Sequence, residues 1–292
     1  PNKYEGMNSD MSGEELAATG DLDIAEDVTI EGANKTTTVV DGNGLDRVFD
    51  VRGGSATFRE ISIQGGNAGT DQGGGVRVLA TLTLIRSRVH DNSAQAGGGV
   101  VAFGSTAELN VIETRIYNNT ASLNGGGVYS YGTVRLLASV MDGNTALNGG
   151  AIGVGATPGP VTLVNSTLSG NSASSSGGGV YTPGTLDLYN ATITANQAPT
   201  GGGVFVGAVA VFNARNSILA DNIDSSTGTL NPDCAGQMTS QGYNLIGETA
   251  GCTIVGTTGN ITGVSADLLP LANNGGLVRT MAISATSPAR DP

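Results

Sequence analysis

The sequence predicts an all-β fold, a right-handed parallel β-helix with three short strands in each coil of about 26 residues. Three observations predict it: a glycine phrase that recurs six times, an asparagine that closes each repeat, and apolar columns that align between repeats. A fixed period of this length indicates units that bury their apolar faces only by stacking on their neighbours. We therefore expect one elongated solenoid.

The glycine phrase contains two or three glycines followed by an apolar residue. Its six copies are spaced 24, 28, 24, 28 and 24 residues apart and begin at Gly73, Gly97, Gly125, Gly149, Gly177 and Gly201. Glycine most easily takes a positive φ and lets another coil approach closely, so we expect these phrases at the corners of the coils. A phosphate-binding loop is disfavoured, because no lysine followed by serine or threonine comes at the required spacing.

An asparagine closes each of the six repeats. These residues are Asn92, Asn119, Asn144, Asn171, Asn196 and Asn222. Apolar residues stand ten and eight positions before each asparagine, which is the two-residue period of a strand with one buried face. We predict that the six side-chain amides form an internal ladder, with hydrogen bonds between coils and to the turn backbone. An antiparallel sandwich would give no reason for identical columns in every repeat.

The repeat divides the chain into three parts. Residues 1–20 are predicted to be an irregular N-terminal segment or cap, and residues 21–225 to be the coils of the β-helix. After Asn222 the repeat becomes irregular. Residues 226–292 are therefore predicted to be disulfide-pinned C-terminal coils followed by a cap or a joint.

The two cysteines of the chain both lie in this C-terminal part. Cys234 and Cys252 are 18 residues apart, which favours one disulfide and hence an oxidising compartment. Two buried thiols are the alternative. The chain begins at Pro1, without a methionine, so we expect an upstream segment such as a signal peptide that either has been removed or lies outside this sequence.

The charge balance restricts the partners. Acidic residues number 25 against 13 basic ones, a formal net charge of −12, which argues against nucleic acid and anionic membranes as partners. No apolar run is long enough to cross a membrane, so we expect no transmembrane segment. No cofactor or metal is indicated, although calcium is compatible with the acidic composition.

Several motifs carry a resemblance to a known family. They are residues 17–24, 41–49, 242–247 and 269–276, together with the repeated Gly-Gly-Gly-Val-Tyr and Asn-Ser/Thr-Ala phrases. With these motifs the chain, over roughly residues 17–289, resembles bacterial secreted β-helix proteins of the polymorphic outer-membrane-protein-like and CSLREA/choice-of-anchor type. The resemblance implies a parallel β-helix exported by a bacterium to the cell surface or beyond. It implies no activity.

The first functional hypothesis is a non-catalytic extracellular structural protein, such as a cell-surface or filament-forming subunit. The two ends of a β-helix expose strand edges that can template another chain. Head-to-tail stacking through such ends does not close and gives a fibre. Residues 1–20 and 273–292 are therefore candidates for caps or for joints, and end-to-end self-association is a candidate interaction.

The second hypothesis is a polysaccharide lyase or glycoside hydrolase. Hydrolysis needs two converging carboxylates, and lyases need a base and a cation such as calcium. Arg88 and Asp91 are the best catalytic candidates. We interpret His90, the only histidine, as an exposed strand residue. The sequence thus assigns no catalytic residue and favours a protein that is not an enzyme.

A glycan-binding adhesin without catalysis is the third hypothesis. Tyr129, Tyr131 and Tyr181 are candidates for stacking on sugars, because the first two and the third lie two coils apart, about 10 Å. The alternative is that these rings stack to stabilise the β-helix itself.

Overall fold

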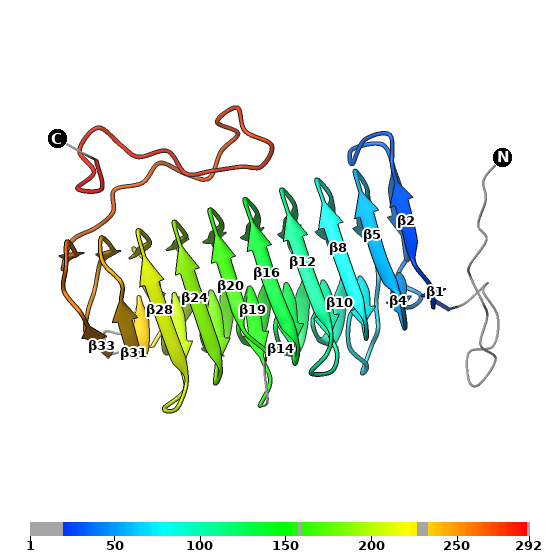
Figure 1. Ribbon diagram of the computed structural model, residues 1–292, viewed down its shortest axis with the longest axis horizontal. Helices are drawn as coiled ribbons and strands as arrows, with labels where there is room; N and C mark the ends of the chain where they lie inside the picture. Colours follow the sequence, from blue (N-terminus) through cyan, green and yellow to red (C-terminus); the bar gives the residue numbers. More distant parts are fainter. Residues whose placement is uncertain (1–19, 157–158, 227–232, 291–292) are drawn as a thin grey trace.

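The computed structural model describes residues 20–156, 159–226 and 233–290, so the predicted N-terminal segment 1–20 lies almost wholly outside the described residues. All regular structure in the described part is β, from β1 to β34. The strands of successive coils pair in parallel and stack as a solenoid (Figure 1). This confirms the predicted all-β parallel β-helix, with three strands per turn in coils of about 26 residues.

The largest sheet has 18 strands and contains two runs that β31 (Cys234–Ser240) joins. The first run, sheet A, consists of β1 (Leu22–Ile24), β4 (Phe49–Val51), β7 (Val76–Val78), β11 (Val100–Ala102), β15 (Val128–Ser130), β19 (Ile152–Val154), β23 (Val180–Thr182) and β27 (Val204–Val206). The second run, sheet B, consists of β2 (Val28–Glu31), β5 (Ser55–Arg59), β8 (Thr81–Ile85), β12 (Glu108–Ile112), β16 (Thr133–Leu137), β20 (Val161–Val164), β24 (Thr185–Tyr189), β28 (Val211–Arg215) and β33 (Cys252–Val255).

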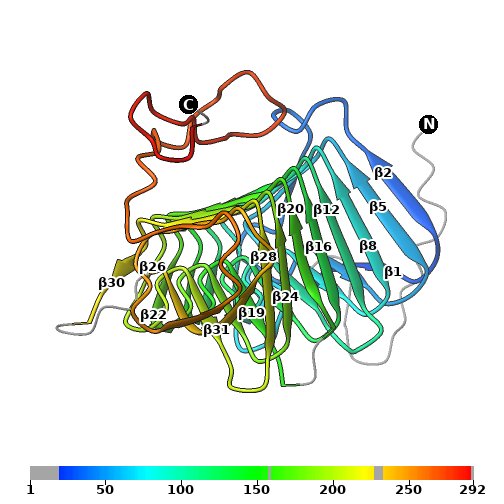
Figure 2. The same ribbon diagram turned by 60° about the vertical axis from the view of Figure 1, so that its left-hand side comes forward.

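Two further sheets complete the coil (Figure 2). The ten strands of sheet C are β3 (Val39–Asp41), β6 (Ser62–Gln64), β9 (Arg88–His90), β13 (Arg115–Tyr117), β17 (Val140–Asp142), β21 (Thr167–Ser169), β25 (Thr192–Thr194), β29 (Ile218–Ala220), β32 (Leu245–Ile246) and β34 (Ile261–Thr262). The six strands of sheet D are β10 (Ser93–Ala96), β14 (Thr120–Asn124), β18 (Thr145–Asn148), β22 (Ser172–Ser176), β26 (Gln197–Ala198) and β30 (Ile223–Asp224).

The core follows from alternation within each short strand. In β8, Leu82 and Leu84 point inward and are fully buried, whereas Thr83 between them is only half-buried. The parallel register then places equivalent residues of successive coils above one another, because Leu82 pairs with Leu109 and Leu109 pairs with Val134. One apolar cluster therefore runs through the whole stack, and each coil completes the core of its neighbours.

The corners of the coil use left-handed backbone. The first glycine of each phrase has a positive φ, between 59° at Gly201 and 73° at Gly73. A second left-handed corner joins sheet B to sheet C, six residues before each closing asparagine. Its occupants are Arg86, Glu113, Ala138, Asn165, Asn190 and Asn216. Asparagine tolerates this conformation better than most side chains, which explains why it recurs there.

After β34 the chain leaves the stack and returns along the outer face of sheet C (Figures 1 and 2). This tail, residues 263–290, packs Ala266 and Leu268 against Ala220 and Leu245 of the stack. Within the tail, residues 268–283 form a hairpin with antiparallel bridges near its base and near its turn. The segment predicted as a cap or joint thus lies beside the stack.

The last coil is open at its C-terminal side. β33 pairs with β31 alone among the described strands. Ile254 of β33 points inward but stays half-buried, whereas Met238, its partner in β31, is fully buried. No described residue covers Ile254 as the next coil would, so the stack ends there on a strand edge.

Candidate functional site

The six closing asparagines form one buried ladder at the corner between sheets C and D. Each Nδ2 donates to the Oδ1 of the next asparagine, from Asn92 to Asn119 at 2.9 Å through to Asn196 and Asn222 at 3.0 Å. From Asn119 onward, each Oδ1 also accepts the backbone N–H of the preceding ladder residue, and Oδ1 of Asn92 accepts that of Gly66. The amides therefore replace strand hydrogen bonds at a corner where no strand continues.

Asp233 extends the ladder by one step. Its Oδ1 accepts from Nδ2 of Asn222 at 2.8 Å, and its Oδ2 accepts from the backbone N–H of Glu248 at 2.6 Å. Burial raises the pKa of Asp233, although these hydrogen bonds act in the opposite direction. Sequence reasoning missed Asp233, because it follows Asn222 after only 11 residues and so breaks the period on which the ladder was recognised.

A second internal ladder, made of hydroxyl groups, was also missed. It lies five residues before each closing asparagine and comprises Ser87, Thr114, Ser139, Ser166 and Ser217, with Ala191 as the one apolar member. The backbone N–H of Ser87 donates to Oγ1 of Thr114 at 3.0 Å, and the pattern repeats to Ser166. Aligning the repeats on this column would have revealed it. Its role is again to satisfy buried backbone at a corner.

The two cysteines form the predicted disulfide. Cys234 lies at the start of β31 and Cys252 at the start of β33, with Cα atoms 5.4 Å apart. The bond therefore ties the last coil to the one before it. A disulfide favours an oxidising compartment and so suggests export.

The three candidate sugar-stacking tyrosines lie on sheet A and beside it. Tyr129 and Tyr131 meet edge to face with centroids 5.0 Å apart, and Tyr129 is only 8% exposed. Tyr181 stacks on Phe205 with centroids 5.3 Å apart. Burial, together with a hydrogen bond between the hydroxyls of Tyr129 and Tyr131, raises the pKa of the Tyr129 hydroxyl. Most of this aromatic surface is used in contacts within the chain, which leaves little of Tyr129 for a sugar.

The catalytic candidates lie on and beside β9. The interpretation of His90 as exposed is wrong: its ring is buried, because it stacks on Tyr117 with centroids 4.6 Å apart. Its Nδ1 lies 2.6 Å from Oδ2 of Asp91. Asp91 follows β9 at a left-handed corner with φ of 55°, whereas Arg88 stands at the start of the strand. Asp91 is thus engaged by His90, and within the described part of the chain it forms no ion pair with Arg88.

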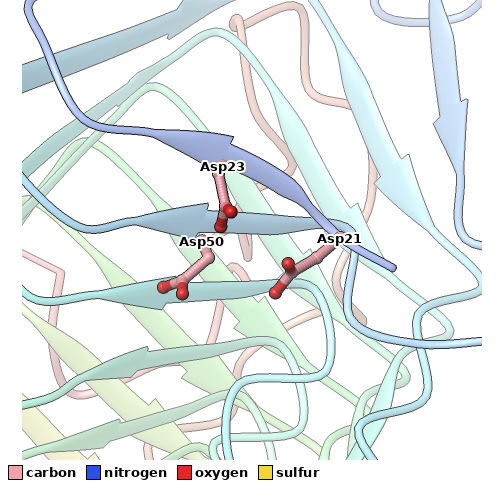
Figure 3. A group of neighbouring side chains, drawn as sticks. All are labelled: Asp21, Asp23 and Asp50. Atoms are coloured by element: carbon pink, nitrogen blue, oxygen red, sulfur yellow. The ribbon is translucent and has the colours of Figure 1, made fainter. Parts of the chain in front are cut away.

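An acidic cluster that the sequence analysis did not identify lies in the first coils. Ligand atoms of Asp21, Asp23 and Asp50 all lie within 4.8 Å of one another (Figure 3). Alignment of Asp23 with Asp50 in neighbouring strands of sheet A was the available signal. Three carboxylates at this spacing could hold a metal ion, so their other neighbours decide what the cluster does.

Guanidinium groups enter this cluster. Arg47 pairs with Asp21, and Arg52 lies 2.9 Å from Asp23. Asp50 accepts from Nε of Arg77 at 2.9 Å. Burial opposes ionisation of Asp50, but its hydrogen bonds from two arginines lower the pKa of the carboxyl overall. The cationic side chains already supply the positive charge that a metal ion would bring, so the cluster is an ion-pair network.

A shallow groove of about 490 Å³ crosses the outer face of sheet B. Most of its apolar lining comes from one column of four successive coils, Ile112, Leu137, Val164 and Tyr189. Asp187 is its only carboxylate among the described lining residues. Glycoside hydrolysis requires two carboxylates, so the groove lacks the residues for that reaction.

Together, the stacked coils and the two internal ladders define a parallel β-helix repeat protein. Residues 165–183 match the Chlamydia polymorphic membrane protein (Chlamydia_PMP) repeat. The matched stretch contains the ladder residue Asn171 and the glycine phrase that begins at Gly177. Comparisons with curated proteins and with solved structures give no match. None of the described residues belong to a helix long and apolar enough to cross a membrane.

Proposed function

We propose that this chain is a non-catalytic structural part of an exported protein displayed at the bacterial cell surface. The observation that carries the proposal is the match of residues 165–183 to a repeat of polymorphic membrane proteins. In that stretch Asn171 serves the ladder and Gly177 the glycine corner, so both recurring residues have structural roles. The disulfide between Cys234 and Cys252 supports export.

Labelling of intact cells tests the surface location. An antibody raised against the folded chain should label intact cells of the source organism as strongly as permeabilised ones, and external protease should remove the signal. A cytoplasmic protein, labelled in parallel, should appear only after permeabilisation. Labelling of this protein that also requires permeabilisation would refute display at the surface.

We further propose that copies of the chain associate end to end through the open C-terminal coil. β33 offers an unpaired strand edge, and Ile254 is an inward-pointing apolar residue that a further coil would cover. Val255, its outward-pointing neighbour, is 47% exposed on the side of the stack. An inward-pointing charge is one means by which natural sheets prevent edge pairing. Substitutions at Ile254 and at Val255 therefore distinguish association through the end of the stack from association through its side.

Sedimentation of two lysine variants tests this association. Wild-type protein should form longer particles as its concentration rises, visible as rods in negative-stain electron micrographs. Ile254→Lys should shift the protein to monomer, because the ammonium group would be buried on stacking. Val255→Lys, on the same strand, should assemble like the wild type. Monomer alone for the wild-type protein at high concentration would contradict the proposal, as would equal assembly of both variants.

A further inference from the structure

A cavity of about 350 Å³ lies between the tail and sheet C. Four basic residues line it: Lys35, Arg88, Arg115 and Arg279. The chain has only 13 basic residues and a net charge of −12, so this cluster of positive charge contrasts with the negative charge of the whole chain. None of the described residues lining the cavity is acidic.

The wall of the cavity on the stack is rigid. Arg88 and Arg115 stand side by side at the start of neighbouring strands β9 and β13. Asp142 holds Arg115 through bonds of 2.6 and 2.5 Å, and the guanidinium carbon lies 3.9 Å from the centre of the Tyr117 ring. Arg88 makes no ion pair with any described carboxylate. Arg115 is therefore neutralised and fixed, whereas Arg88 presents an uncompensated charge.

Two further cations line the cavity, one from the tail and one from the loop between β2 and β3. Arg279 comes from the turn of the tail hairpin, which Ala272 and Thr280 close through reciprocal backbone hydrogen bonds of 3.0 Å. Lys35 is anchored by its backbone carbonyl, which accepts from Oγ of Ser62 at 2.7 Å. Burial lowers the pKa of the Lys35 ammonium, and the charge of Arg88 acts in the same direction while Glu60 opposes both. Burial of the ammonium is thus the main cause of the lowered pKa, and the charge of Arg88 adds to it.

Glu60 is shared with another cation. Its Oε1 lies 2.8 Å from Nε of Arg86, so it cannot serve Lys35 alone. With Arg88, Lys35 and Arg279, the cavity thus has three positive groups from three separate segments of the chain. Guanidinium groups bind carboxylate, sulfate and phosphate through paired charge-assisted hydrogen bonds.

We propose that this cavity binds an oxyanion group, a carboxylate, sulfate or phosphate, carried on a ligand about the size of a sugar. The volume lies at the lower end of the range for small-molecule sites. Arg88 binds the anion from the stack and Arg279 from the tail, so the ligand also fastens the hairpin to the first coils. This site is distinct from the structural role proposed above and does not depend on it.

Calorimetric titration of the full chain tests the site with four probes: galacturonate, inorganic sulfate, inorganic phosphate and neutral galactose. The anions should bind and galactose should not. Arg88→Gln and Arg279→Gln should each weaken binding about tenfold or more, since each removes charge-assisted hydrogen bonds. Arg135→Gln, in the groove of sheet B, is the matched control and should bind as the wild type does. Hydrogen exchange of residues 269–282 should slow when an anion is bound.

The relative affinities identify the source of the anion. Tighter binding of galacturonate than of sulfate and phosphate would assign an acidic sugar, and tighter binding of either inorganic ion would assign a free oxyanion or its ester. Absence of binding by every probe would overturn the proposal. So would equal weakening by Arg135→Gln and Arg88→Gln, because the effect would then be one of overall charge.

Discussion

Replacement of Asn144 by alanine is expected to lower the free energy of unfolding by about 4 kcal/mol, because it leaves buried polar groups without partners. Asn144 Oδ1 accepts the backbone N–H of Asn119 at 3.0 Å, and its Nδ2 donates to the carbonyl of Ile116 at 3.0 Å. Both groups are enclosed by neighbouring coils and lose their partner in the variant. Urea unfolding followed by circular dichroism measures the difference.

Asn165→Ala is the matched control for this variant. Asn165 belongs to an exposed corner column, where it accepts one hydrogen bond from Asn190 at 3.1 Å. Ala138 occupies the same corner of another coil with φ of 48°, so alanine fits this backbone. We expect a loss of about 1 kcal/mol or less. Equal losses in the two variants would mean that burial of the ladder contributes nothing to stability.

Asn144 also shows how far the sequence determines the fold. Because a parallel stack places equivalent residues above one another, periodicity in the sequence is periodicity in space, and the columns could be read directly. Ladder, corners and inward-facing strands follow from that register alone. The disulfide was predictable for a different reason, since the chain has only two cysteines.

What the sequence could not predict lies where the period ends. The tail has no repeat, so nothing in its spacing indicated that it folds back along sheet C. The cavity that the tail closes is lined by both Arg88 and Arg279, although Arg279 lies 191 positions further along the chain. Contacts peculiar to one coil leave no periodic signal. His90 was misjudged because its column is mostly polar and was therefore taken as exposed, whereas Ser169 and Thr194 of the same column are buried as well.

Replacement of Gly126 by alanine is expected to cost about 3 kcal/mol or more, through overpacking between coils. A Cβ on Gly126 would lie 2.4 Å from the carbonyl oxygen of Thr145 and 2.5 Å from that of Gly150. Both atoms are backbone of the next coil, so relief requires the coils to separate and weakens the pairing on either side. Thermal unfolding, together with hydrogen exchange in sheets A and D, should show the loss concentrated around this coil.

Gly127→Ala distinguishes this collision from a general intolerance of alanine at the corner. Its Cβ would lie 2.4 Å from Cε of Met141, the end of a flexible side chain, and 2.8 Å from the carbonyl oxygen of Ala151. Ala151 itself holds the corresponding place in the next coil, so the stack accommodates a methyl group there. The loss for Gly127→Ala should therefore be clearly smaller than for Gly126→Ala. A reversed order would show that backbone approach between coils is not what requires the second glycine of the phrase.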